Sequence, residues 1–421
     1  MTPVELFGNM IEKNYEKRPV LTRGIIRVGY AAQQMLLNIN PDQGLLPSQQ
    51  YLAKICMKYT RKPLQSPESS ALVNLFFPCE LLHAMDIAPQ CVEGFSAFLC
   101  GGRGEHGYLK FAEEKGVPDT YCSYHKTLLG AVLSGTVPKP RFILTTNTIC
   151  DANTTTFDAI ARHFEMPRIM IDVPFERTPD AVQYVTEQLE QLITFLEDEL
   201  SRKMDPERLR KAVMHSNAAT AAHQEYLTEL QDRFVPTSAT VELYRILCSH
   251  ILMGSPEAQT FYERLLADSR RCEARSGKRI LWCHVLPFYS DSLKKLFRDR
   301  EGVQLLVSDL TYDSMLPLDE QRPLQSIACR LIDNNLNGPL LRRCDSVLKM
   351  ARRLHADGAV LFCHWGCKQN NGGVFGLQDS LQEAGIKTII LDGDGCDRSN
   401  MSQGQFDTRL QAFLEMLEAG I

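Results

Sequence analysis

The sequence predicts an α/β protein with two small, doubly wound parallel sheets and additional helical segments. Residues 66–177 and 277–421 alternate apolar segments of strand length with segments of helical periodicity, which is typical of parallel sheets covered by helices. Residues 178–276 are helical in pattern almost throughout, and residues 1–65 contain no strand-like run. At 421 residues the chain is too long for one ordinary hydrophobic core, which favours two domains.

Composition narrows the classes of function. The hydrophobic fraction of 44% and the charged fraction of 23% are those of a globular protein, and no apolar run approaches the roughly 20 residues of a membrane helix. The N-terminus lacks the uninterrupted apolar segment of a secretory signal, so we expect a cytoplasmic protein without a membrane partner. A net charge of −5 without a long basic block argues against nucleic acid as the main partner. The same charge is compatible with a small acidic ligand.

The N-terminal region and the first α/β domain account for residues 1–177. Apolar residues at helical spacing in 4–17 and 48–59 predict a helical lead-in. In the first domain we expect three segments of strand length, and helices that begin near Cys122 and near Thr155. The segments of strand length are SALVNLFF (70–77), RFILTT (141–146) and RIMIDV (168–173).

The connecting region and the second α/β domain complete the chain. In DAVQYVTEQLEQLITFLEDELSRK, apolar residues recur at three- and four-residue steps among charges, which predicts a solvated amphipathic helix. In the second domain we expect four strands, each followed by a helical segment or a ligand-bearing loop. The strands are predicted in RILWCHVLPF (279–288), VQLLVSDL (303–310), AVLFCHWGC (359–367) and KTIILDGDGC (387–396).

The positions of the fourteen cysteines separate candidate ligands from core residues. Ligands of doubly wound sheets bind beyond the carboxyl ends of the strands, and Cys150, Cys363, Cys367 and Cys396 follow or close predicted strands. Cys122 opens a predicted helix, whose N-terminal dipole favours a thiolate. Six others have helical, mid-strand or otherwise unremarkable contexts and are interpreted as buried core residues: Cys56, Cys248, Cys272, Cys283, Cys329 and Cys344.

Spacing alone leaves the chemistry of these thiols open. The closely spaced C-x-x-C pairs of a typical zinc site are absent. Dispersed thiolates that meet between two domains suit an iron–sulfur cluster or zinc, because both are preferred by soft sulfur ligands. Core packing is a third interpretation of each cysteine.

Several ordered motifs resemble one protein family. FFPCELLHAMDIAP, YCSYHK and ICDANTTTFDAIARHFEMPRIMIDVPFERTPDAVQYVTEQLEQL are similar to the first half of 2-hydroxyacyl-CoA dehydratase subunits, a family shared with benzoyl-CoA reductase subunits. The segment DGAVLFCHWGCKQNNGGVFGLQDSLQEAGIKTIILDGDGC and the end of the chain resemble its closing region. The resemblance covers roughly residues 70–200 and 277–421. It implies two flavodoxin-like domains with a 4Fe-4S cluster held between them.

The resemblance also implies a ligand set and a mechanism. Matched motif by motif, the three cluster ligands are Cys122 in YCSYHK, Cys150 in ICDAN and Cys367 in HWGCKQ. Three thiolates leave one of four irons open. The implied reaction starts when an ATP-hydrolysing iron–sulfur activator injects one electron, which forms a ketyl radical on the acyl-CoA thioester. The substrate then loses its 2-hydroxyl group and a proton, and the electron is recycled.

The implied partners are the activator, an acyl-CoA substrate and a homologous second subunit or a second copy of this chain. The sequence contains no G-x-G-x-x-G after a first strand and no G-x-x-x-x-G-K-[ST], so ATP hydrolysis is assigned to the activator. The implied site includes Glu80, which would orient substrate or move a proton, with a helix-terminal carboxylate as the alternative. His364 is the second candidate and would protonate the leaving hydroxyl, with a satisfied loop residue as the alternative.

The chain also departs from a three-ligand pattern. Further thiols near the predicted strand ends are not needed by one cubane: Cys79, Cys91, Cys100, Cys363 and Cys396. A related branch with a double-cubane cluster uses about twice as many thiolates and reduces small molecules. That branch is the alternative enzyme, and a non-catalytic partner subunit or a zinc-stabilised scaffold is the alternative without redox chemistry.

Overall fold

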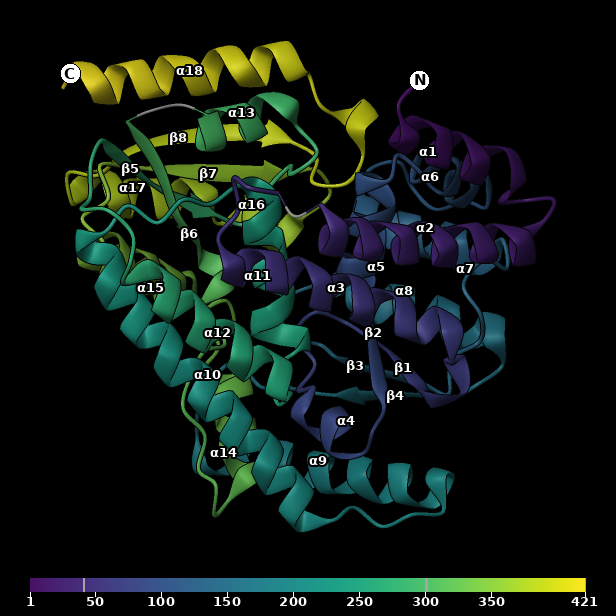
Figure 1. Cartoon of the computed structure of the whole chain (residues 1–421). Helices are drawn as coiled ribbons and strands as arrows, with labels where there is room; N and C mark the ends of the chain where they lie inside the picture. The colour runs from purple at the N-terminus through teal and green to yellow at the C-terminus, as the bar shows by residue number, and fades with distance from the viewer. Residues whose placement is uncertain (41, 300–301, 421) are drawn as a thin grey trace.

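The computed structural model describes residues 1–40, 42–299 and 302–420, and within them the chain forms two four-stranded, all-parallel sheets (Figure 1). This confirms the predicted α/β class. The first sheet contains β1 (Ser70–Val73), β2 (Ala88–Cys91), β3 (Phe142–Thr146) and β4 (Arg168–Ile171). The second contains β5 (Lys278–Cys283), β6 (Val303–Ser308), β7 (Gly358–His364) and β8 (Lys387–Gly393).

The two sheets share one topology. The spatial order is β2-β1-β3-β4 in the first and β6-β5-β7-β8 in the second, so each domain places its first strand between its second and third. This is the flavodoxin-like order, in which chain direction around the sheet reverses between the first and third strands. The crevice at that switch point is where ligands bind in such sheets.

Burial follows this order. The central strands β1, β3 and β7 are buried along their full length, whereas the edge strands β4 and β8 are mostly half-buried. Apolar segments without a polar alternation, such as FILTT and GAVLFCH, suit strands covered on both faces. The sequence did not predict β2, because Pro89 interrupts it and cannot donate a hydrogen bond to a neighbouring strand. Proline is tolerated in edge strands, and β2 lies at the edge of its sheet.

Helices surround the sheets. Preceding the first sheet are α1 (Pro3–Asn14), α2 (Pro19–Ile39), α3 (Pro47–Gln65) and the 3-10 turn η1 (Pro67–Ser69). Within the first α/β region are α4 (Glu80–Ala84), α5 (Val92–Gly101), α6 (His106–Glu114), α7 (Ser123–Leu133) and α8 (Asp151–Phe164). Between the sheets are α9 (Pro179–Leu200), α10 (Pro206–Asp232), α11 (Ala239–Ile251) and α12 (Pro256–Ser269).

The second α/β region has its own helices. They are α13 (Asp291–Asp299), η2 (Asp309–Thr311), α14 (Pro323–Ile332), α15 (Leu340–Arg353), α16 (Lys368–Gly372), α17 (Val374–Glu383), η3 (Arg398–Asn400) and α18 (Gln403–Ala419). None of the helices in the described part of the chain is long and apolar enough to cross a lipid bilayer.

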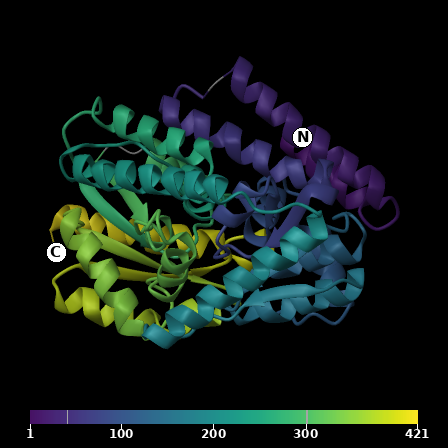
Figure 2. The same cartoon turned by 90° about the horizontal axis from the view of Figure 1, so that it is seen from below.

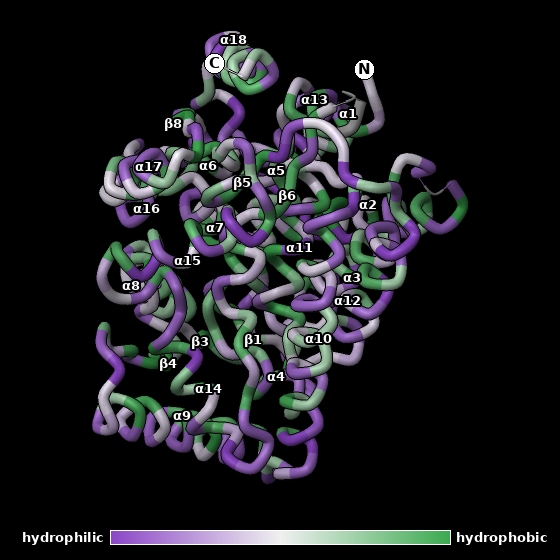
Figure 3. Tube along the Cα trace, turned by 90° about the vertical axis from the view of Figure 1, so that its left-hand side faces the viewer, coloured by the Kyte–Doolittle hydropathy of each residue, from purple (hydrophilic) through white to green (hydrophobic). Residues whose placement is uncertain are grey.

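The connecting helices α9–α12 contact both α/β regions. Helix α9 packs on α14, α10 on α4 and α12, and α11 on both α3 and η2. In Figure 2 the teal helices of this region lie against the blue first region and the green second region. Polar and hydrophobic residues alternate along α9 in Figure 3, as expected for its amphipathic sequence.

The starts of these connecting helices have local causes. The side chains of Thr178, Asp205, Ser238 and Ser255 each accept a hydrogen bond from a backbone N–H of the helix that follows. Such N-caps satisfy donors that have no partner within the helix. Short polar side chains therefore fix where the four helices begin, and their apolar faces then hold the two α/β regions in contact.

Candidate functional site

Three cysteines lie at equivalent local positions, each as the N-cap of a helix. Cys122 precedes α7, Cys150 precedes α8 and Cys367 precedes α16. Helix α8 begins at Asp151, four residues before the predicted start near Thr155, so Cys150 itself occupies the cap. The dipole at a helix N-terminus favours negative charge, and a thiolate at such a position is stabilised.

The loops that carry Cys122 and Cys367 are in backbone contact. A Cβ atom on Gly366 would lie 2.7 Å from the backbone nitrogen of Cys122 and 2.8 Å from its Cα atom. Gly366 also has a φ of +80°, which favours glycine. This glycine therefore allows a loop of the second α/β region to meet a loop of the first, although the two cysteines are far apart in sequence.

Left-handed backbone conformations flank the site. Ile149, directly before Cys150, has a φ of +76°, and His284, directly after β5, has a φ of +81°. A β-branched residue with a positive φ is a genuine outlier, and such strain persists only where surrounding structure enforces it. The turns beyond β3 and β5 are thus held in shapes that local preference alone would not select.

Each of the three cysteines contacts one imidazole. The Nε2 atom of His364 lies 3.3 Å from Cys122 Sγ, and the Nε2 atom of His284 lies 3.5 Å from Cys367 Sγ. The Nε2 atom of His125 lies 3.9 Å from Cys150 Sγ. His364 and His284 lie at the ends of β7 and β5, the two central strands of the second sheet, and their ring centroids are 6.1 Å apart.

Burial determines the charge state of these rings. It lowers the pKa of His125 to about 3 and that of His284 well below the ordinary value. Burial also lowers the pKa of His364, against an opposing effect of Asp394. All three imidazoles are therefore neutral near pH 7, and each carries one N–H donor.

Burial and mutual proximity raise the pKa values of the thiols. Burial, followed by the charges of Cys150 and Cys367, raises the pKa of Cys122 well above its usual value. Burial and Cys367 raise the pKa of Cys150 to about 12, although the backbone N–H groups of Ala152 and Asn153 oppose this. The three sulfur atoms are thus close enough to repel one another as thiolates, and ionising them together requires a compensating positive group.

A buried polar network supports the Cys367 side of the site. Asp309 accepts from the backbone N–H of His284 at 2.6 Å and from Arg343 at 2.7 Å. Arg343 also donates to Asn370 Oδ1 at 2.8 Å, in the short helix that Cys367 caps. Because an ion pair and a hydrogen bond hold it, the turn at His284 is anchored to the helix after Cys367.

A second network ties α7 to the loop after β8. Asp394 Oδ1 accepts from Ser123 Oγ at 2.5 Å and from the backbone N–H groups of Cys396 and Asp397, both at 2.8 Å. The neighbouring Gly395 donates its backbone N–H to His364 Nδ1 at 3.0 Å. The residue after Cys122 and the ring of His364 are therefore held by one loop.

Glu80 does not contact this group of thiols and imidazoles. Its carboxylate is fully buried and accepts from Arg330 through two bonds of 2.7 Å and from Ser216 at 2.7 Å. Burial alone would raise its pKa, but the Arg330 guanidinium lowers the pKa of Glu80 to about 2. The pair joins α4, α10 and α14, which are elements of three different parts of the chain.

A small cavity of about 20 Å³ lies between Arg330 and the loop before Cys150. Its lining includes Phe76, Phe77, Thr148, His250 and Arg330. In the described part of the chain the Thr148 hydroxyl is buried without a hydrogen-bond partner. At this volume the cavity has room for about one water molecule.

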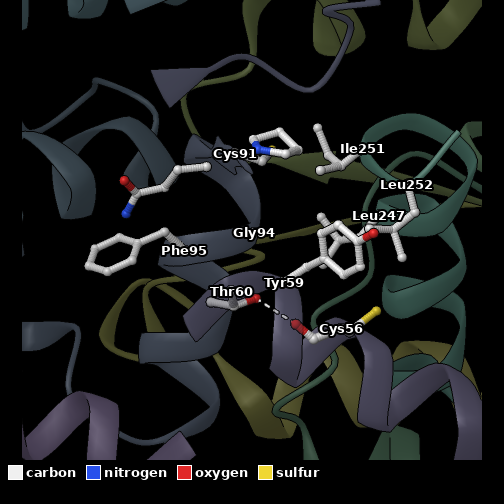
Figure 4. A pocket seen from close by; sticks show the side chains of 11 residues that line it. Cys56, Tyr59, Thr60, Cys91, Gly94, Phe95, Leu247, Ile251 and Leu252 are labelled. Atoms are coloured by element: carbon white, nitrogen blue, oxygen red, sulfur yellow. Dashed lines mark hydrogen bonds between the residues drawn. The ribbon is translucent and has the colours of Figure 1, made fainter. Parts of the chain in front are cut away.

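The remaining strand-end cysteines have other contacts. Cys100 and Cys396 are fully buried and close enough to affect each other's pKa, and Cys91 donates to Glu93 at 3.0 Å. Cys79 is buried beside Glu80. Cys363 lies within β7, and Cys367 is near enough to help raise the pKa of Cys363. Cys56 and Cys91 line a separate apolar cavity of about 30 Å³ between α3, α5 and α11, shown in Figure 4.

The arrangement does not suit a single ion. Among the described residues, no group of three or more His, Cys, Asp or Glu side chains is placed to hold one metal ion. Zinc binds sulfur at about 2.3 Å, so its ligands crowd around one point. Cys122, Cys150 and Cys367 come instead from the N-termini of three separate helices.

Sequence reasoning found the three thiols and His364 but missed His125, His284 and Arg343. His284 follows β5 directly, so the strand-end rule applied to the cysteines would have found it. His125 lies three residues after Cys122 within the quoted YCSYHK motif. Arg343 lies in the middle of a charged helical stretch, and nothing in its local sequence marks it.

Two flavodoxin-like domains with helix-capping thiols at their facing loops define a class of two-domain α/β protein. Comparison with known families identifies it further, because residues 74–417 match the family described as 2-hydroxyglutaryl-CoA dehydratase, D-component. The match covers most of the 421 residues, and the chain belongs to this family. The resemblance found in the sequence motifs is thereby confirmed.

Individual relatives agree with this family. The chain is 24% identical to the (R)-phenyllactyl-CoA dehydratase alpha subunit of Clostridium sporogenes, over 88% of this chain and 95% of that protein. It is also 24% identical to the (R)-2-hydroxyisocaproyl-CoA dehydratase alpha subunit of Clostridioides difficile, over 81% and 88%. Identity to the beta subunit of the C. sporogenes enzyme is 22%, over 86% and 95%.

Proposed function

We propose that this chain is the cluster-binding subunit of an enzyme that removes water from a 2-hydroxyacyl-CoA thioester. The observation that carries the proposal is the meeting of three N-cap thiols where the two flavodoxin-like domains face each other. The relatives are named as dehydratase subunits for two different 2-hydroxyacyl-CoA esters, which supports the substrate class.

The donor set fits an iron–sulfur cluster. Cys122, Cys150 and Cys367 would hold it, since soft thiolates select iron–sulfur centres and helix N-termini stabilise the ionised sulfur. Cys122 is buried, and Cys150 and Cys367 are half-buried, which limits access of water and oxygen to a low-potential centre. A bound cluster with one iron free of protein ligands would supply one-electron transfer to the thioester carbonyl.

The chain's own residues would position the substrate and exclude water. The cavity beside Thr148 and Arg330 has room for about one water molecule, so in this structure it would admit no more than a single small polar group of the substrate. The Thr148 hydroxyl, which has no hydrogen-bond partner in the described part of the chain, would orient such a group, a 2-hydroxyl or a carbonyl oxygen, there.

Proton transfer by Glu80 or His364 stays a prediction. Both side chains already have partners within the protein, Arg330 and Ser216 for Glu80 and Cys122 and Gly395 for His364. Any proton transfer to substrate would have to displace one of these partners. We therefore propose positioning roles first, with Glu80 holding Arg330 at the cavity wall.

The proposed partners are a homologous second subunit and an activator. The chain is similar to both an alpha and a beta subunit, which supports assembly with a related chain, either a second subunit or a second copy of this one. The activator, an ATP-dependent iron–sulfur protein, belongs to the proposal because this sequence has no motif for ATP hydrolysis.

Metal analysis of the anaerobically purified chain tests the proposal. We expect about four irons and four sulfides per chain for one cubane. Cys122→Ala, Cys150→Ala and Cys367→Ala should each lower the iron content sharply, whereas Cys272→Ala should retain it. Equal iron in all four variants, or zinc without iron, would contradict the assignment.

A double-cubane reductase is the second candidate, favoured by Cys100 in α5 and by Cys396 in the loop that also holds His364. About eight irons per chain would support it. An assay with activator, second subunit and 2-hydroxyacyl-CoA esters then separates the functions. A non-catalytic role would be favoured by two results together. Turnover would require the second subunit, and turnover would persist in variants of this chain that lose their iron.

A further inference from the structure

The histidines beside the three thiols have hydrogen-bond partners that fix where their protons lie. This matters for the proposed cluster, on which the following inference rests, because an N–H group and a ring lone pair act on a thiolate in opposite ways. A donor stabilises the negative sulfur, whereas a lone pair repels it.

His364 has its proton on the nitrogen that faces Cys122. The backbone N–H of Gly395 donates to His364 Nδ1 at 3.0 Å, and a backbone N–H can only donate. The Nδ1 atom therefore carries a lone pair, and the single proton of the neutral ring is on Nε2. That atom lies 3.3 Å from Cys122 Sγ, within reach of an N–H···S hydrogen bond.

His284 also carries its proton on the nitrogen that faces a cysteine, for a different reason. Its Nδ1 atom is buried and has no hydrogen-bond partner in the described part of the chain, while its Nε2 atom lies 3.5 Å from Cys367 Sγ. A proton on Nδ1 would be a buried donor without an acceptor, which is costly. A proton on Nε2 finds the thiolate.

His125 differs from the other two. Its Nδ1 atom lies 2.9 Å from the Thr156 hydroxyl, which can either donate or accept. Its contact with Cys150 is also the longest of the three, at 3.9 Å. The hydrogen-bond pattern assigns no direction here, so the inference is confined to His364 and His284.

We propose that His364 and His284 donate N–H···S hydrogen bonds to the cluster-binding thiolates of Cys122 and Cys367 and thereby make the cluster easier to reduce. Hydrogen bonds to the sulfur ligands are among the factors that set the potential of an iron–sulfur cluster. Reduction adds negative charge, and nearby donors stabilise that charge. The two histidines are positioning residues that act through the thiolates, and Asp309 and Gly395 hold them in place.

A redox titration of the full-length, anaerobically purified chain tests this inference. His364→Phe and His284→Phe remove the donor, whereas His364→Gln and His284→Gln offer an amide N–H in a similar place. The matched control is His163→Phe, at the exposed end of the helix that Cys150 caps. Iron content and the reduction potential, followed by electron paramagnetic resonance, are measured for each.

We expect a more negative potential in both phenylalanine variants, a larger shift in the double variant, recovery in both glutamine variants and no change in the control. An unchanged potential in phenylalanine variants that retain iron overturns the inference. If those variants lose iron, wild-type chain with ¹⁵N-labelled histidine is used instead. Hyperfine coupling of the labelled nitrogen to the reduced cluster supports the hydrogen bonds, and its absence overturns them.

These outcomes are distinguishable from failure of the proposed function. Wild-type chain without iron would overturn the proposed function and this inference together. Wild-type chain that contains iron but shows no effect of the histidines would overturn the inference alone.

Discussion

The two α/β regions have the same strand order but use their switch points differently. In the first, the residue directly after β1 is Asn74, which bonds to Thr145 and Thr146 at the end of its own sheet. In the second, the residue directly after β5 is His284, whose side chain reaches Cys367 beyond the neighbouring strand. Equivalent positions thus close the sheet in one region and contact a candidate ligand in the other.

The comparison extends to the cysteines. Cys150 and Cys367 both follow the third strand of their sheet and both come directly after a residue with a positive φ, Ile149 and Gly366. Cys122 has no counterpart in the second region and comes from a helix that packs on α8. A repeated topology therefore supplies two thiols symmetrically, and a third thiol makes the set asymmetric.

The largest expected loss of stability comes from breaking the ion pair between Glu80 and Arg330, because this pair joins the first α/β region to the second. Glu80→Gln leaves the buried guanidinium unpaired and should lower the free energy of unfolding by about 3–5 kcal/mol, measured by urea denaturation. The control Arg162→Gln, on an exposed side chain, should change it by less than about 0.5 kcal/mol. A loss below about 1 kcal/mol for Glu80→Gln would mean that the regions are held by other contacts.

Acid should remove the same stabilisation from the wild type. The pKa of Glu80 is about 2 in the folded chain against an ordinary value of 4.5, so its carboxylate favours folding above pH 4.5. The advantage of wild type over Glu80→Gln should shrink by about 3 kcal/mol as the pH falls from 4.5 to about 2. Parallel stability curves for the two proteins in that range would refute this assignment.

Gly366 tests the second switch point. Gly366→Ala places a methyl group against the Cys122 backbone in a left-handed conformation and should cost roughly 1–3 kcal/mol of unfolding free energy. It should also lower iron content, because it separates the two loops. Gly372→Ala is the matched control, since its Cβ atom would meet open space, and equal behaviour of both variants would contradict the close approach.

Ile149 tests the first switch point and gives the smallest expected effect. Asparagine tolerates a positive φ better than isoleucine, so relief of strain should offset the lost apolar contacts. Ile149→Asn should therefore change the free energy of unfolding by about 1 kcal/mol or less. Ile160→Asn, at a fully buried position of α8, should cost several times more. Similar losses in both variants would show that Ile149 is held by packing and not by its turn.

Much of the fold followed from sequence pattern. Unbroken apolar segments predicted the buried strands, and three- and four-residue spacing predicted the long connecting helices. The prediction failed at β2, where Pro89 and short length hide an edge strand, and at the start of α8. Both failures occur where neighbouring strands or a capped turn, and not local periodicity, decide the conformation.

The site was predictable to a smaller extent. Strand ends and one helix start identified Cys122, Cys150 and Cys367, because a parallel sheet gathers its carboxyl ends at one edge. The position of Glu80 at the start of a short helix could not reveal Arg330, which lies 250 residues later in the chain. Arg330 becomes the partner of Glu80 only when α14 packs near α4.

The sequence by itself determined the class of fold and the family, and it supplied the candidate ligands Cys122, Cys150 and Cys367, because these depend on periodicity and on motifs contained in short segments. Only the tertiary structure decided which thiol faces which imidazole and on which ring nitrogen His364 carries its proton. The physical reason is that these contacts join residues 25 to 242 positions apart in the chain, so no local segment contains both partners.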